Sequence, residues 1–159
     1  MEKEDRFTLG VFTCIFNKDY SKILLLYRNA KKRARWGADW GNIGGLVEFG
    51  ETSLQAAIRE AYEEIGIKFK PSDLRLIYVK ETLNFMPHIQ AVHFVYAVTL
   101  DENAEIKLNA HTKTLESESY QWFPINELPE RMLDKKDDII MWRNLAKSNS
   151  YIESNSKWQ

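Results

Sequence analysis

The spacing of apolar and polar residues predicts alternating strands with two longer helices. β-branched and aromatic residues fill Phe7 to Phe16 and Ile23 to Tyr27, with the turn residues Asn17-Lys18-Asp19 between them, so the two runs are expected to form a hairpin. Shorter apolar runs predict further strands at residues 40–43, 74–81, 89–100 and 120–123.

Two segments show a helical period instead. Thr52 is expected to cap the first helix with Gln55 completing a capping box, and Gly66 suits the left-handed residue that ends it. Its apolar side chains recur at spacings of three and four, at Leu54, Ala57, Ile58, Ala61 and Ile65. The second helix is predicted over residues 134–147, with a packing side made of Ile139, Ile140, Trp142 and Leu145.

The segments between these elements are expected to be loops. Residues 28–35 hold five bases and no acid, which indicates either a solvated, mobile loop or a rim that attracts phosphate. Residues 84–88 predict a short loop and residues 101–119 a long one. Residues 1–148 are interpreted as one domain, and residues 149–159 as a polar, flexible tail.

Composition narrows the class of protein. The chain has 159 residues, of which 44% are hydrophobic and 28% charged, and this is ordinary for a globular domain. A net charge of −1 argues against broad, nonspecific nucleic-acid binding. The single cysteine, Cys14, cannot form an internal disulfide and is expected to be buried and inert. Because the chain also lacks an 18-residue apolar run and a secretory signal, we expect a cytoplasmic protein that does not span a membrane.

A cluster of carboxylates on the first helix is the strongest sign of chemistry. At 100° per residue, Glu60, Glu63 and Glu64 fall on an arc away from the apolar stripe, and only Arg59 offers them a nearby partner. Hard oxygen ligands of this kind suit Mg²⁺ or Mn²⁺, and Glu51 in the preceding loop is placed to join them. The alternative is an acidic surface face with no ligand.

The spacing of the surrounding residues favours the metal site. The matching positions are Gly45, Glu51, Arg59, Glu60, Glu63, Glu64, Gly66 and Ile67. Together they resemble the Nudix box, the signature of Nudix (MutT-like) hydrolases, with every fixed position filled. The resemblance implies an α/β/α sandwich with a mixed sheet between helices, and hydrolysis of a diphosphate linkage in a nucleoside diphosphate joined to some group X.

The resemblance also implies roles for the box residues. Glu60 and Glu64 are expected to be the main metal ligands, Glu63 to complete the set while Arg59 holds it, and the carbonyl of Gly45 to be a further ligand. A carboxylate must also take a proton from the attacking water. Nudix enzymes often place one more carboxylate before a strand such as residues 120–123.

Candidates for the remaining roles lie outside the helix. Glu51 and Glu118 compete for the role of general base, with Glu116 as second choice to Glu118 in the loop. Arg28, at the end of a strand, is expected to offset the charge of an anionic substrate. Trp36 is interpreted as either a packing residue or a stacking surface for a nucleobase, and Phe85 as a lining residue of the substrate pocket.

Several substrates and two other functions stay open. The substrate can be a nucleoside triphosphate, a nucleotide sugar, a dinucleoside polyphosphate or a coenzyme. A non-catalytic nucleotide-binding regulator would be expected to have lost box carboxylates, and none is lost here. An enzyme acting on an RNA 5′ end is supported only by the basic run at residues 28–35. A homodimer is a further possibility implied by the family.

Overall fold

A computed structural model describes residues 2–152 as a mixed sheet between helices. Its helices are α1 (Ala30–Trp36), α2 (Ser53–Ile65) and α3 (Lys136–Lys147), with short 3₁₀ turns at Pro71–Asp73 and Ile125–Glu127. Its strands are β1 (Arg6–Phe16), β2 (Lys22–Arg28), β3 (Trp40–Gly41), β4 (Ile43–Leu46), β5 (Arg75–Met86), β6 (Ile89–Thr99) and β7 (Ser117–Pro124).

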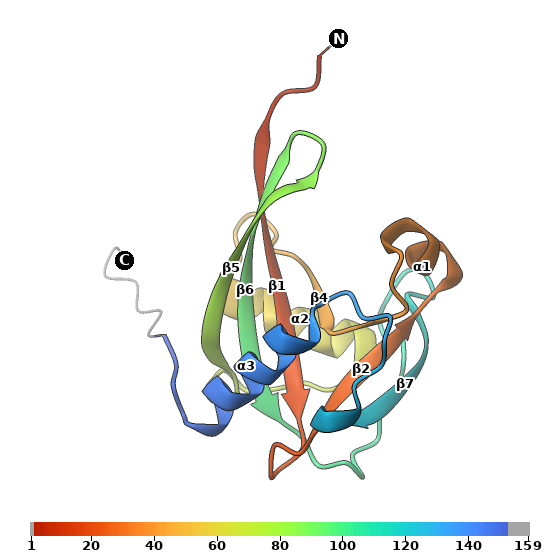
Figure 1. Ribbon diagram of the computed structural model, residues 1–159, viewed down its shortest axis with the longest axis vertical. Coiled ribbons are helices and arrows are strands. Elements are labelled where there is room, and N and C mark those ends of the chain that lie inside the picture. Colours follow the sequence, from red (N-terminus) through yellow and green to blue (C-terminus); the bar gives the residue numbers. More distant parts are fainter. Residues whose placement is uncertain (1, 153–159) are drawn as a thin grey trace.

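Strand β1 is the centre of the sheet (Figure 1). It runs parallel to β6 along its whole length, and its other edge pairs antiparallel with β4 near its middle and with β2 at its end. β5 pairs antiparallel with β6, whereas β7 and β3 pair with β2. The parallel and antiparallel pairs together make the expected mixed sheet.

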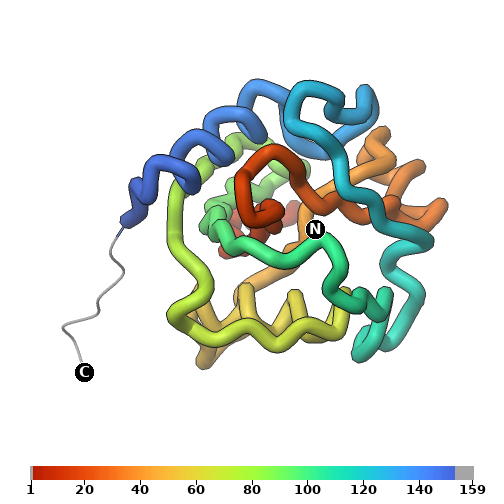
Figure 2. Tube along the Cα trace, turned by 90° about the horizontal axis from the view of Figure 1, so that it is seen from below, coloured from red at the N-terminus to blue at the C-terminus, as the bar shows by residue number. Residues whose placement is uncertain are grey.

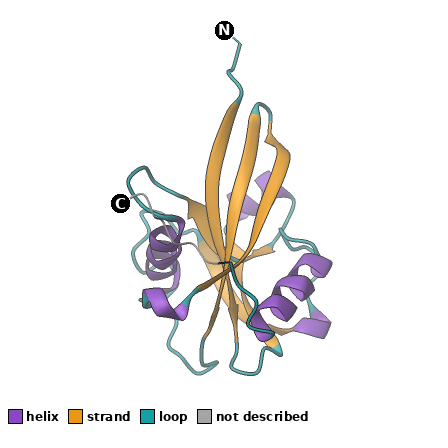
Figure 3. Ribbon diagram, turned by 90° about the vertical axis from the view of Figure 1, so that its left-hand side faces the viewer, coloured by secondary structure: helices purple, strands orange, loops and turns teal. Residues whose placement is uncertain are grey.

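Helices α2 and α3 cover opposite faces of this sheet (Figures 2 and 3). Because side chains alternate between the faces of a strand, neighbouring residues of β2 enter different cores. Leu24 and Leu26 pack on the side of α2, and Ile23 and Leu25 on the side of α3 with Trp142. This alternation explains why the strands read as continuous apolar runs, and it confirms the α/β/α sandwich.

Three long strands, β1, β5 and β6, extend beyond the helices at the end of the sheet that carries the N-terminus (Figure 3). The predicted strand and helix at residues 7–16 and 52–65 are confirmed, and α2 has the full capping box between Thr52 and Gln55. Cys14 is fully buried, and burial raises its pKa. No helix among residues 2–152 is long and apolar enough to cross a membrane.

The prediction of a loop over residues 28–35 was wrong, because most of it forms α1. Asn29 caps this helix by accepting a hydrogen bond from the Lys32 amide at 2.8 Å, and Gly37 ends it with a φ of 64°. Lysine and arginine are good helix formers, so the segment needs no apolar stripe to be helical once its ends are capped. The expectation of a mobile loop at this position therefore fails.

Three other boundaries were also wrong. The loop predicted at residues 84–88 shrinks to the turn between β5 and β6, since β5 continues to Met86. The strand predicted at residues 40–43 is split into β3 and β4, and β4 continues through Gly44 and Gly45 to Leu46. β7 starts at Ser117 instead of residue 120. Part of the tail predicted at residues 149–159 lies outside the described residues.

Candidate active site

Helix α2 meets the sheet at strand β4, and the acidic residues gather at this junction. Arg59 is the common partner of the cluster. Its Nη2 and Nε donate to the Glu51 carboxylate at 2.7 and 3.1 Å, and its Nη1 donates to Glu60 at 2.9 Å and to Glu63 at 3.3 Å. Nη2 also donates to the Leu46 carbonyl at 3.1 Å. One guanidinium thus joins the loop, the helix and the end of β4.

The Glu60 carboxylate lies directly against Gly45 of β4. A Cβ placed on Gly45 would be 2.3 Å from Glu60 Oε1, so only glycine leaves room for this carboxylate. Burial, followed by the nearby carboxylate of Glu64, raises the pKa of Glu60 to about 7. The glycine of the box therefore makes the space in which a half-buried acid is held close to other acids.

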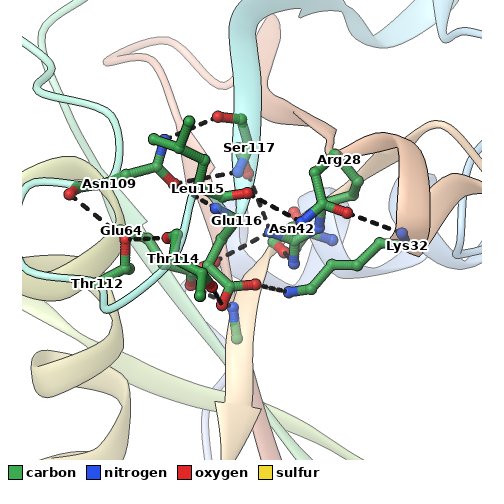
Figure 4. A network of polar contacts seen from close by, with 12 residues as sticks. Arg28, Lys32, Asn42, Glu64, Asn109, Thr112, Thr114, Leu115, Glu116 and Ser117 are labelled. Atoms are coloured by element: carbon green, nitrogen blue, oxygen red, sulfur yellow. Dashed lines mark hydrogen bonds and ion pairs between the residues drawn. The ribbon is translucent and has the colours of Figure 1, made fainter.

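The Glu64 carboxylate is buried and hydrogen-bonded within the protein, unlike a carboxylate that is free to bind a metal. Its side chain is 5% exposed; Oε1 accepts from Arg28 Nη1 at 3.0 Å and Oε2 accepts from the Gly44 amide at 3.1 Å. Burial raises the pKa of Glu64, and the charge of Arg28 opposes this shift. Arg28 is held in turn by the Asn42 carbonyl at 2.9 Å and the Ser117 hydroxyl at 3.3 Å (Figure 4).

The donor set of this cluster fits a divalent cation, although it is not gathered into a ready-made site. Within residues 2–152 no three acidic, histidine or cysteine side chains form a group that would hold a metal by itself. Glu60, Glu63 and Glu51 nevertheless share one arginine, and burial together with the nearby carboxylate of Glu64 raises the pKa of Glu60 despite its bond with Arg59. Carboxylate oxygens placed in this way are suitable ligands for Mg²⁺ or Mn²⁺.

The two acids expected from the long loop are engaged elsewhere. Glu118 lies 3.0 Å from Arg33 of α1 and is about half exposed, and Glu116 pairs with Lys32 of the same helix (Figure 4). Glu51, in contrast, belongs to the same ion-pair network as Glu60, and hydrogen bonds from Arg59 lower its pKa. The structure therefore brings Glu51, and not Glu118, into the cluster formed by the box.

A cavity of about 620 Å³ lies beside the box. Gly44 and Gly45 line it on the side of the acidic cluster, and Arg28 lines it as well. Trp36 of α1 and Phe85 of β5 also line the cavity and stack on each other with ring centroids 5.3 Å apart. The cavity thus joins the expected substrate residues, which come from three separate elements, to the glycines of the box.

Asn42, Lys80 and Asp134 are among the further polar residues of this cavity that were not identified from the sequence. Asn42 Nδ2 donates to Asp134 Oδ2 at 3.2 Å across 92 positions of the chain. No motif or spacing marks such residues, because only the tertiary fold brings them to one cavity.

Known proteins resemble the chain in both sequence and fold. The model of the NUDIX domain matches residues 6–143. An ADP-ribose pyrophosphatase from Methanocaldococcus jannaschii is 30% identical over 133 residues, which cover 82% of this chain and 72% of the relative. A CMP-5′-(N-acetyl-N-hydroxy-3-aminopropyl)phosphonate hydrolase from Streptomyces rubellomurinus is 27% identical over 121 residues. That match covers 76% of this chain but 54% of the relative, so the chain spans about half the relative's length.

A solved structure supports the same assignment at the level of fold. The crystal structure of a MutT NUDIX hydrolase from Burkholderia pseudomallei has a TM-score of 0.69 to this chain at 23% identity, with 87% of this chain and 98% of the other covered. The match to the family model covers α1, α2 and the part of α3 up to Arg143, and it includes every residue of the box. This chain belongs to the Nudix family.

Proposed function

We propose that the chain is a metal-dependent pyrophosphohydrolase that cleaves the diphosphate linkage of a nucleoside diphosphate joined to a group X. The observation that carries the proposal is the contact between Glu60 and Gly45, beside the 620 Å³ cavity. In this contact a half-buried carboxylate, paired with Arg59, lies beside a residue that lines a pocket with aromatic and cationic walls. Family membership and the pyrophosphatase named among the relatives support the same reaction.

The box residues would hold Mg²⁺ or Mn²⁺ through Glu60 and Glu63, with Glu64 and the Gly45 carbonyl as further candidate ligands. A bound divalent ion would neutralise phosphate charge and lower the pKa of an attacking water. Arg59 orients Glu51, Glu60 and Glu63 through its hydrogen bonds. Because these carboxylates are already held in position, they do not have to reorganise during the reaction.

Glu51 is our first choice for the general base. Its two oxygens are aligned by Arg59, and it lies in the same network as Glu60. Glu118 stays the competitor, and its ion pair with Arg33 is the argument against it. Arg28, which lines the cavity, would carry part of the positive charge that an anionic substrate needs.

Hydrolysis of an RNA 5′ end is less well supported than a small nucleotide substrate. Two of the basic side chains that suggested it, Lys32 and Arg33, are neutralised by Glu116 and Glu118. Salt bridges reduce the charge that a helix presents to a phosphate backbone. The cavity lined by Trp36 and Phe85 instead favours a small substrate with one base.

A panel of nucleoside triphosphates, nucleotide sugars, dinucleoside polyphosphates and coenzymes, assayed for phosphate and pyrophosphate release, tests the proposal. Turnover is expected with Mg²⁺ or Mn²⁺ and not with EDTA. Glu60→Gln should lower kcat by three orders of magnitude or so, because neutral glutamine is a poor ligand for a hard cation. Glu127→Gln, on the exposed surface, is the matched control. Turnover in EDTA, or near-normal kcat in Glu60→Gln, would contradict the proposal.

Glu51→Gln and Glu118→Gln, compared in the same assay, separate the two candidates for the base. The true base is expected to lose kcat by at least about a hundredfold, which is the usual contribution of general base catalysis. The other variant should stay close to wild type in kcat. A large loss in Glu118→Gln alone would reject Glu51.

A further inference from the structure

The segment between β6 and β7 closes the end of helix α2, which carries the box acids. Three of its backbone amides donate to the last carbonyls of this helix. The bonds run from Lys107 to Ile65, from Asn109 to Glu64 and from His111 to Glu63, with lengths of 3.0, 2.8 and 2.9 Å in that order. Because the final carbonyls of a helix lack partners within the helix, these amides hold the end of α2 in place.

Asn109 also fixes this segment to the sheet. Its backbone has a φ of 56°, a left-handed conformation that asparagine adopts more readily than most residues. Its side-chain Oδ1 accepts from the Glu116 amide at 2.8 Å and from the Ser117 amide at 3.1 Å (Figure 4). Its Nδ2 donates to the Ser117 carbonyl at 2.8 Å. Most of the hydrogen-bonding capacity of this amide is therefore used where β7 begins.

Through these contacts Asn109 reaches both ends of Glu64. Its own N–H holds the Glu64 carbonyl. The Glu64 carboxylate accepts from Arg28 Nη1 at 3.0 Å, and the same nitrogen donates to the Ser117 hydroxyl at 3.3 Å. Ser117 is buried, and Asn109 binds its backbone on both sides. One asparagine thus joins the backbone of Glu64 to the residues that hold its side chain.

We propose that Asn109 is a positioning residue: by joining the end of α2 to the start of β7, it keeps the Glu64 carboxylate against the Gly44 amide. Asn109 is not among the residues that line the cavity, so it acts through Ser117 and Arg28 and not on the substrate. This inference rests on the proposed function, because Glu64 is a candidate metal ligand there. Loss of a partner that orients a ligand typically changes metal affinity or activity by roughly 10–100-fold.

A role in stability alone is the alternative. Further hydrogen bonds close the turn of residues 109–117, since Thr112 Oγ1 donates to the Thr114 carbonyl at 2.7 Å and Thr114 Oγ1 donates to Glu116 at 2.9 Å. In the alternative, loss of the Asn109 side chain loosens only this turn. The test must therefore measure the Glu64 carboxylate itself and compare it with a distant part of the core.

The variant Asn109→Gly isolates the side chain. Glycine adopts the same positive φ without strain and keeps the N–H that bonds the Glu64 carbonyl, so the change removes only the bonds to Glu116 and Ser117. Asn149→Gly is the matched control. Asn149 also has a positive φ, of 58°, and it follows α3, which covers the face of the sheet opposite α2.

Hydrogen exchange of the Gly44 amide, followed by NMR in the metal-free protein, reports the position of the carboxylate. This amide donates to Glu64 Oε2 at 3.1 Å, so its protection depends on Glu64 staying in place. The ratio of the Gly44 exchange rate to that of the buried core residue Ile15 is expected to rise about tenfold in Asn109→Gly. Asn149→Gly should leave the ratio unchanged. An unchanged ratio in Asn109→Gly, or an equal rise in both variants, would overturn the proposal.

The requirement for metal gives a second measurement. The concentration of Mn²⁺ that supports half-maximal turnover is expected to rise about tenfold in Asn109→Gly and to stay at the wild-type value in Asn149→Gly. A purely structural role would lower Tm and leave this concentration unchanged. An unchanged requirement for Mn²⁺ in Asn109→Gly would therefore reject the assignment.

Ser117→Ala provides the test if Asn109→Gly does not fold. It keeps the backbone that Asn109 binds and removes the hydroxyl contact with Arg28. The exchange ratio of Gly44 to Ile15 should then rise about fivefold, the usual effect of one hydrogen bond. No rise in this variant would also overturn the proposal.

Failure of the proposed function would look different. Hydrogen exchange is measured without metal and without substrate, so it does not depend on hydrolysis. Faster exchange at Gly44 in Asn109→Gly, together with no hydrolysis of any diphosphate compound by the wild type, would count against the proposed function alone. Metal-dependent hydrolysis by the wild type, together with an unchanged exchange ratio in Asn109→Gly, would count against Asn109 alone.

Discussion

The charge on Glu60 couples pH to stability in the metal-free protein. Its pKa rises from an ordinary 4.5 to about 7 on folding, so the folded state binds more protons than the unfolded state between these values. Stability should therefore fall as pH rises through this window, by on the order of 2–3 kcal/mol from the energy of one pKa unit. Urea unfolding in EDTA at pH 5, 6, 7 and 8 measures the decrease.

The variant Glu60→Gln cannot ionise and is the control for this pH dependence. Its stability should change less between pH 5 and 8 than that of the wild type, because the other groups of the network stay in place. A wild-type protein that becomes more stable as pH rises from 5 to 7 would show that burial does not govern this carboxylate.

Single residues differ in how far the sequence reveals them. The clustering of Glu60 and Glu63 around Arg59 could be predicted because it depends on spacing along one helix, and α2 keeps that spacing. The bond between Glu64 and Arg28 could not be predicted, since it joins residues 36 positions apart through the sheet. Asp134 was missed for the same reason: its partner Asn42 is 92 positions away.

Helix α1 is the element whose stability should affect substrate binding most directly. Asn29 caps it and also donates to the Leu115 carbonyl at 2.9 Å, and Arg35 and Trp36 at its end line the cavity. Asn29→Ala is expected to lower the free energy of unfolding by about 1 kcal/mol, the usual effect of losing a cap. Since the box lies on α2, KM should rise while kcat stays close to wild type. Steady-state kinetics and urea unfolding provide the two measurements.

Asn29→Asp separates the cap from the second contact. Aspartate still accepts from the Lys32 amide but cannot donate to Leu115, so it should restore KM if the cap is what positions α1. A fall in kcat with unchanged KM in Asn29→Ala would mean that α1 acts on the chemical step instead.

Elements with an apolar period were predicted well, and elements without one were not. β1, β2, β6 and α2 follow the expected spans closely because burial on a sheet face or a helix stripe leaves a regular pattern. α1 is stabilised by caps and by ion pairs with Glu116, just before the distant strand β7, and with Glu118 in that strand. Its helical state is therefore a property of the folded chain more than of its own apolar pattern.

At the scale of the whole molecule, the sandwich itself followed from the order of elements and from the box. The hairpin of β1 and β2 was predicted as well, but the pairing of β4 with β1 was not, because β4 and β2 share one edge of β1 and no local pattern specifies that division. This division of the edge of β1 determines which residues reach the candidate active site. This edge brings Gly45 of β4 against α2 and leaves Arg28 of β2 beside the same cavity.

A divalent cation at this junction should stabilise the whole fold, because its candidate ligands come from α2 and β4. At a metal concentration of 100 times Kd, binding to the folded state alone adds about 2.7 kcal/mol. For a chain of this size that corresponds to a rise in Tm of about 5–10 °C. The rise should be full at pH 8 and smaller at pH 5.5, since Glu60, with a pKa of about 7, must lose its proton to bind. Differential scanning calorimetry with Mg²⁺ or Mn²⁺ measures it, and an equal rise in Glu60→Gln would place the cation elsewhere.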